Sequence, residues 1–255
     1  MTIEVATIPC LSDNYAFLVH NSDTGQTALV DAPETAPILK ALSARGWGLS
    51  EVWITHHHYD HTQGLNGLKD AFDLNVRGPS AEAHKLPPLD IALEGGDTFE
   101  FAGHSVEVMS VPGHTNGHIA YYMPSASTVF TADSLMALGC GRLTEGTPDE
   151  MWSSLCKIAA LPPETIVCSG HEYTENNARF ALTIDPDNTD LKARVAEISD
   201  ARSRNTPTVP STLAVELATN PFLRAQDSAI RSLLNKKEAP DVDVFAEIRA
   251  RKDAF

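Results

Sequence analysis

The segment Val52–His61, VWITHHHYDH, constrains this chain most, because four of its 10 histidines and one carboxylate lie within the last six positions. Histidine is the commonest protein ligand for transition metals, and a carboxylate oxygen completes mixed nitrogen and oxygen sites. The apolar run before the cluster indicates a strand that enters a loop, so alternate residues face the same way. His56 and His58 can therefore share one ion. The adjacent residues Asp60 and His61 could serve a second ion beside it.

Further histidine and aspartate residues follow other expected strands where each strand ends. They lie in Val111-Pro-Gly-His114, Phe130-Thr-Ala-Asp133 and Val167-Cys-Ser-Gly-His171. Loops at one end of a sheet gather functional groups on a rigid scaffold. The candidate ligands are His56, His58 and His114 for one ion, Asp60, His61 and His171 for the other, and Asp133 between the two. Seven nitrogen and oxygen ligands without a thiolate suit two divalent metal ions, first of all Zn²⁺, with Fe or Mn as alternatives.

Two ions about 3.5 to 4 Å apart can share a water and lower its pKa towards neutrality. The sequence therefore favours a hydrolase that uses a metal-bridging hydroxide, with Asp60 helping to orient it and no Ser or Cys nucleophile. Taken alone, the histidine cluster could also be a solvated loop or an adventitious metal binder. The remaining histidines are expected at the surface or beside the ligands, namely His20, His57, His84 and His104. His118 is expected to have a structural role.

Two regions that differ in predicted secondary structure are expected along the chain. The first contains short apolar runs with the composition of strands, at 15–19, 28–31, 52–55, 74–77, 106–111, 119–123, 128–131 and 165–168. It also contains helical patterns at 36–45 and 148–160, the second with a capping box at Thr147 and Glu150. After about residue 172 helices are expected at 177–182, 190–204, 212–218, 227–234 and 242–252. We therefore predict a mixed α/β metal-binding domain at 1–172 and a small helical domain at 173–255.

Composition narrows the function classes further. The formal net charge of −15 repels phosphate backbones and anionic membranes, so neither a nucleic acid nor a membrane is an expected partner. No apolar run approaches the length of a membrane span, and no secretory signal is evident at the N-terminus. The four cysteines are widely spaced and indicate no disulfide framework. We expect a soluble, cytoplasmic monomer.

The segment THHHYDH matches the HxHxDH signature of the metallo-β-lactamase superfamily, and His114, Asp133 and His171 match its later ligand positions. The resemblance implies an αββα sandwich with the metal site at one edge of the sheets. More specific segments resemble the glyoxalase II (hydroxyacylglutathione hydrolase) family over essentially the whole chain. These are IPCLSDNY at 8–15, CGRL at 140–143, EGT at 145–147, GHEYT at 170–174, TNPFLR at 219–224 and IRARKD at 248–253.

That family hydrolyses S-D-lactoylglutathione to D-lactate and glutathione, the second step of methylglyoxal detoxification. The resemblance implies that Arg142 and Tyr173 contact the glutathione part of the substrate, and that Arg249 and Lys252 hold its glycine carboxylate. A local cationic site is needed physically, because glutathione is anionic and so is this chain. Thr144 departs from the family, since some members have an aromatic residue there.

Two other functions are compatible with the same residues. One is an iron-dependent persulfide dioxygenase of the same fold, which uses one iron and oxygen. The other is a non-catalytic module that binds metal or glutathione without turnover. The predicted helical extension and the pair Arg249 and Lys252 favour the hydrolase. A secreted β-lactamase is disfavoured because no export signal is evident.

Overall fold

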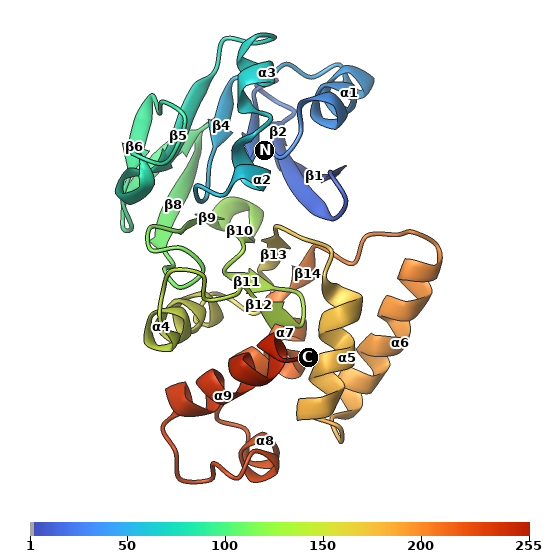
Figure 1. Cartoon of the computed structure of the whole chain (residues 1–255). Helices are drawn as coiled ribbons and strands as arrows, with labels where there is room; N and C mark the ends of the chain where they lie inside the picture. Colours follow the sequence, from blue (N-terminus) through green and yellow to red (C-terminus); the bar gives the residue numbers. More distant parts are fainter. Residues whose placement is uncertain (1–2) are drawn as a thin grey trace.

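The computed structural model describes residues 3–255 and contains two six-stranded sheets with helices on their outer sides (Figure 1). The first sheet is antiparallel from β1 to β3 and parallel from β3 to β6. Its strands are β1 (Ile3–Cys10), β2 (Asn14–Asn21), β3 (Thr27–Val30), β4 (Glu51–Trp53), β5 (Asn75–Pro79) and β6 (Ile91–Leu93).

The second sheet has the strand order β14-β13-β10-β9-β8-β7, in which β10 and β13 are parallel and the other pairs are antiparallel. Its strands are β7 (Thr98–Phe101), β8 (His104–Ser110), β9 (Ile119–Met123), β10 (Thr128–Ala132), β13 (Ile166–Ser169) and β14 (Ser211–Thr212). A separate hairpin joins β11 (Leu135–Met136) to β12 (Gly139–Cys140).

The helices fall into two groups along the chain. In the first part they are α1 (Thr35–Arg45), α2 (Tyr59–Thr62), α3 (Leu65–Lys69) and α4 (Pro148–Ala159), with 3₁₀ turns η1 (Ser80–Glu82) and η2 (Pro124–Ala126). In the second part they are α5 (Thr174–Ile184), α6 (Thr189–Ser203), α7 (Leu213–Thr219), η3 (Pro221–Leu223), α8 (Ser228–Leu233) and α9 (Asp241–Asp253). None of the helices between residues 3 and 255 combines the length and the apolar character that crossing a membrane requires.

Three large apolar clusters hold these layers together. Side chains such as Trp53 and Phe130 fill the space between the sheets, and Ile38 and Leu42 of α1 cover the outer face of the first sheet. The outer face of the second sheet packs against α4 and the C-terminal helices, where Phe245 of α9 is fully buried. Because burial of apolar area is the main driving force of folding, the C-terminal helices are a structural layer of the molecule.

The expected α/β class with a sandwich of sheets and helices is confirmed, and the capping box at Thr147 and Glu150 is present at the start of α4. The expectation of no strand after residue 172 is wrong, because β14 pairs with β13. Strands β1, β6 and β7 were also not expected. All three are at or near a sheet edge and their outward residues are partly exposed, so their apolar signal is weak.

Candidate metal centre

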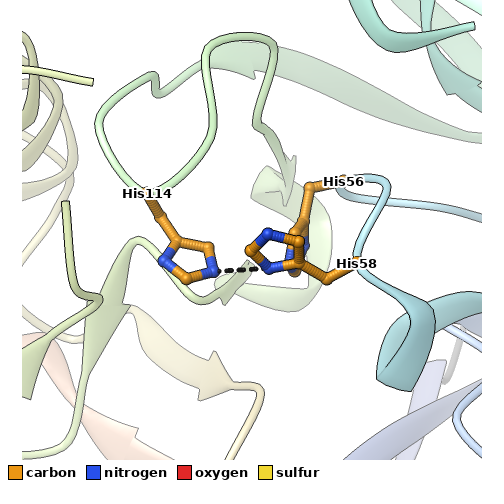
Figure 2. Close-up of side chains that lie close together, drawn as sticks. All are labelled: His56, His58 and His114. Carbon is orange, nitrogen blue, oxygen red and sulfur yellow. Dashed lines mark hydrogen bonds between the residues drawn. The ribbon is translucent and has the colours of Figure 1, made fainter. Parts of the chain in front are cut away.

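Three histidines from two loops face one another at the first candidate ion position. His56 and His58 follow β4, and His114 lies in the loop between β8 and β9. The Nε2 atom of His114 lies 2.9 Å from Nδ1 of His58 (Figure 2), and Nε2 of the buried His56 has no hydrogen-bond partner within residues 3–255. One nitrogen from each ring lies within 4.8 Å of the others. Three imidazole nitrogens that converge in this way fit a cation that all three lone pairs can bind.

The second candidate ion position lies between α2 and the segment that follows β13 of the second sheet. The Nε2 atoms of His61 and His171 are 3.3 Å apart, and Asp60 Oδ2 lies 3.8 Å and 3.5 Å from them, respectively. His61 and His171 are buried, whereas the Asp60 side chain is 43% exposed. Two imidazoles and one carboxylate that reaches solvent form a mixed nitrogen and oxygen site with an open side.

Asp133 lies between the two positions, directly after β10. Its Oδ1 is 3.5 Å from His61 Nε2, and its Oδ2 is 3.4 Å from His114 Nε2 and 3.3 Å from His171 Nε2. Burial raises the pKa of Asp133, but the imidazoles of His171 and His61 outweigh that effect and hold the pKa well below its usual range. The carboxylate therefore stays charged and faces both groups of ligands. The structure thus brings all seven expected ligands into one cluster.

The orientation of the histidine rings is fixed by oxygen atoms on the side away from the cluster. Carboxylate and carbonyl oxygens accept hydrogen bonds, so the ring Nδ1 atoms that contact them must donate. The Thr55 hydroxyl donates its own hydrogen to Asp31 Oδ2, so it also accepts from the ring beside it. The contacts are His56 Nδ1 with Thr55 Oγ1 (3.0 Å), His61 Nδ1 with Asp31 Oδ2 (2.8 Å), His114 Nδ1 with the Arg142 carbonyl (2.8 Å) and His171 Nδ1 with Asp13 Oδ1 (2.9 Å). In the neutral form of these rings, each Nε2 atom then carries a lone pair that a metal ion can bind, as such outer partners usually ensure.

Asp31 and Asp13 are site residues that the sequence analysis missed. Asp31 follows β3 and accepts from the Thr55 backbone and hydroxyl as well as from His61. Its φ of 57° lies in the left-handed region, which aspartate tolerates better than most residues. A carboxylate at the end of a strand, the signal that pointed to Asp133, was present here too. Asp13 lies in the short loop between β1 and β2, and its only signal was its place in the family segment at 8–15.

A glycine is required at position 170 because metal-ligand side chains lie very close to its backbone. A Cβ atom at this position would lie 2.5 Å from Asp133 Oδ1 and 2.9 Å from the His61 ring. Gly113 and Gly170 each precede a candidate ligand, but glycine suits the two positions for different reasons. The φ of Gly113 is 139°, a conformation that favours glycine, whereas at Gly170 the missing side chain makes room for the metal ligands.

Three of the four expected substrate contacts, Arg142, Arg249 and Lys252, belong to a group of cations next to this centre. Lys252 of α9 is half-buried; burial first, and then Arg249, Arg179 and Arg142, lower its pKa to about 8. Arg179 on α5 was not expected in this group. His114 Nδ1 donates to the Arg142 carbonyl, and this bond connects the segment of one cation to a loop that carries a candidate ligand.

Arg249 lies mostly beneath the surface. It is 5% exposed and donates to the Cys140 carbonyl and to Asp253, at 3.0 Å and 2.7 Å. Its Nε has no hydrogen-bond partner among the residues described. Tyr173, in contrast, is 41% exposed and stacks on the ring of His171, with centroids 4.6 Å apart. Tyr173 is therefore placed at the open edge of the metal cluster.

Thr144 has a structural contact in place of the aromatic ring found in some family members. Its hydroxyl donates to the backbone carbonyl of His114. The Thr144 residue is exposed, and this hydrogen bond restrains the loop that carries a candidate ligand.

The other histidines are not among the seven candidate ligands of this cluster. His118 is fully buried behind the cluster, stacks on His56 at 4.7 Å and accepts from the Asp133 backbone at 3.3 Å, in keeping with a structural role. His57 contacts carboxylates rather than the cluster. The expectation that His20 and His104 lie at the surface or beside the ligands is wrong, because both are buried and bond to hydroxyl groups elsewhere.

Two family models together match nearly the whole chain. The model described as the metallo-beta-lactamase superfamily matches residues 12–171, and the model of the hydroxyacylglutathione hydrolase C-terminus matches residues 172–255. A curated "Hydroxyacylglutathione hydrolase" of Roseobacter denitrificans is 67% identical over 255 residues, with 100% of both chains covered. The chain belongs to the hydroxyacylglutathione hydrolase family. The resemblance noted in the sequence and the expectation of a hydrolase are thereby confirmed.

A second family member and a solved structure are also similar to this chain over most of its length. A hydroxyacylglutathione hydrolase of Ruegeria pomeroyi is 62% identical, again with 100% of both chains covered. The crystal structure of TTHA1623 "in a di-iron-bound form" superposes with a TM-score of 0.61 at 27% identity. That comparison covers 86% of this chain and 100% of the solved one.

Proposed function

We propose that this protein hydrolyses S-D-lactoylglutathione, and related 2-hydroxyacyl-glutathione thioesters, to the hydroxy acid and glutathione. In the cell this reaction is the second step of methylglyoxal detoxification. The observation that carries the proposal is the cluster of His56, His58, Asp60, His61, His114, Asp133 and His171 in a chain 67% identical to a curated hydroxyacylglutathione hydrolase. The cluster supplies the chemistry, and the family supplies the substrate class.

The donor set fits two divalent metal ions, one held by His56, His58 and His114 and the other by Asp60, His61 and His171, with Asp133 shared. Such ions lower the pKa of a bound water and stabilise negative charge on a carbonyl oxygen. Zn²⁺ suits these ligands best, and Fe or Mn could occupy one or both positions. The di-iron form of TTHA1623 supports the count of two.

Asp60 is the residue that we propose to act on the attacking water. Burial raises its pKa, but His61 and the Asn14 amide more than compensate, so the pKa is lowered and the carboxylate is charged. Asn14 Nδ2 donates to Asp60 Oδ2 at 3.0 Å and also to the Asp60 backbone carbonyl at 3.1 Å. The fixed carboxylate can accept a hydrogen bond from water and orient it towards the thioester. A thiolate leaves readily, so no strong general acid is required.

The glutathione part of the substrate is proposed to bind at the cationic group beside the centre. Arg142, Arg249 and Lys252 would attract its carboxylates, and Tyr173 would contact the peptide at the open edge. Lys252 remains half-buried and able to reach a ligand, whereas Arg249 contributes its charge from below the surface. In a chain of net charge −15, this local positive field is what permits an anionic substrate to approach.

We further propose the domain division 1–172 and 173–255, with catalysis in the first part and most of the glutathione contacts in the second. We also propose that the protein acts as a monomer in the cytoplasm. The cysteines Cys10, Cys140, Cys156 and Cys168 are all free, which fits a reducing compartment.

Incubation of the metal-replete protein with S-D-lactoylglutathione tests the proposal. Loss of thioester absorbance should match the release of free thiol, with no uptake of oxygen. His58→Ala is the variant that should abolish both signals by removing one ligand. Oxygen uptake with a glutathione persulfide would favour the dioxygenase, and tight binding of the thioester without turnover would favour the non-catalytic module.

A further inference from the structure

His57 lies between two candidate metal ligands in sequence but faces away from both ion positions. Its Nδ1 is 2.9 Å from Glu82 Oε2, and its Nε2 is 3.4 Å from Glu145 Oε1. The ring is 16% exposed, so these contacts are largely shielded from water. A carboxylate accepts, and therefore Nδ1 of His57 donates to Glu82.

Glu82 connects the two loops that carry the first three histidines. The residue is 2% exposed and lies in η1, outside every motif noted in the sequence. Its Oε2 also accepts from the His57 backbone at 2.8 Å, and its Oε1 accepts from the Gly117 backbone at 2.9 Å. One buried carboxylate thus holds the backbone between His56 and His58 and the backbone three residues after His114.

The fit around this carboxylate is tight. A Cβ atom on Gly117 would lie 2.5 Å from Cγ of Glu82. Glu145 adds a second connection, because its Oε2 accepts from the Asn116 backbone at 3.0 Å and its Oε1 accepts from Lys85 at 2.7 Å. A shift of either loop would therefore break one of these hydrogen bonds or bring the loop into steric conflict with Glu82.

The contacts of Glu82 and Glu145 support the ion position formed by His56, His58 and His114. The backbone groups that Glu82 and Glu145 accept from belong to His57, Asn116 and Gly117. The rings at the other position are oriented by different carboxylates, Asp31 and Asp13. Among the residues described, Glu82 and Glu145 support only the first position, whereas Asp31 supports the second directly through His61 and reaches the first through the Thr55 hydroxyl beside His56.

We propose that Glu82 is a positioning residue that acts through His57 and Gly117 to hold His56, His58 and His114 at the spacing of one metal ion. The inference rests on the proposed two-metal function. Outer hydrogen bonds of this kind typically change metal affinity by about 10- to 100-fold. Loss of Glu82 should therefore weaken one ion position and leave the other nearly unchanged.

Competition between the metal-free protein and a chromophoric chelator for Zn²⁺ measures both affinities. For Glu82→Gln we expect one equivalent of Zn²⁺ to bind about 10- to 100-fold more weakly and the second within about twofold of wild type. Glu51→Gln is the matched control, because Glu51 accepts from Trp53 Nε1 and Arg77 Nε, each at 2.9 Å, and touches neither ligand loop. That control should retain both affinities.

Unchanged affinities in Glu82→Gln, or equal weakening at both positions as in a general loss of stability, would overturn the inference. If Glu82→Gln does not fold, His57→Phe replaces it, since this variant keeps the backbone bond to Glu82 and loses the ring bond. It should weaken the same single equivalent by a smaller factor, and no weakening would again overturn the inference. Wild-type protein that binds fewer than two equivalents would instead refute the two-metal function, and the inference with it.

Discussion

The charge of Lys252 should make the binding of glutathione derivatives depend on pH. Its Nζ lies 3.4 Å from the Asn176 carbonyl and over the rings of Phe180 and Phe255, at 5.2 Å and 5.1 Å from their centroids. Burial and the neighbouring arginines lower its pKa to about 8. The ammonium is therefore the prevailing form below pH 8, and its attraction for a carboxylate is lost as the pH rises through that value.

The size of the effect follows from the populations and from the partial exposure of Lys252. With a pKa of about 8, roughly nine-tenths of the side chain is protonated at pH 7 and about one-tenth at pH 9. A partly exposed ion pair contributes about 1 kcal/mol, which is roughly a fivefold difference in affinity between the two forms. Weighting the two affinities by these populations gives binding about threefold weaker at pH 9 than at pH 7.

Calorimetric titration with S-methylglutathione, a thioether that cannot be hydrolysed, measures this directly. Lys252→Arg is the matched variant, because a guanidinium stays charged throughout this range. Titration of groups on the ligand affects both proteins alike, so the ratio of their dissociation constants isolates Lys252. A ratio that is flat from pH 7 to 9, or one that shows wild-type binding tightening relative to Lys252→Arg as the pH rises, would refute the reasoning.

Three further substitutions test separate parts of the account. Asp31→Asn weakens the support of His61 and should lower affinity for Zn²⁺ by about 10- to 100-fold in chelator competition; unchanged affinity would contradict its orienting role. Gly170→Ala places Cβ 2.5 Å from Asp133 Oδ1, so we expect less bound metal with an unchanged circular dichroism spectrum, and full metal content would count against it. Thr147→Ala removes the capping box of α4 and should lower the free energy of unfolding in urea by about 1 kcal/mol without altering Zn²⁺ binding.

The sequence was most informative where strand ends coincide with metal-binding side chains. His114, Asp133 and His171 could be placed near the HxHxDH segment because each follows a short apolar run, and such runs end at a common sheet edge. Helix α4 could be predicted almost to the residue because its cap is local in sequence. The superfamily motif added the architecture that these local signals alone did not specify.

Residues whose role depends on distant contacts could not be predicted. Glu82 lies 25 residues from His57, and nothing near it in sequence distinguishes it from a surface glutamate. Arg179 lies on an exposed face of α5 and joins the cationic group only through the packing of α5 and α9. Strand β14 is two residues long and forms because β13 offers it an edge. In each case the signal is created by tertiary structure.

The most direct test of the account is to locate the metal ions. Crystals of the Zn²⁺-loaded protein, measured at the zinc absorption edge and combined with elemental analysis of the same preparation, give both number and position. The account predicts two ions per chain, one among His56, His58 and His114 and one among Asp60, His61 and His171, with Asp133 between them. A single ion, no ion, or ions bound away from these side chains would contradict it.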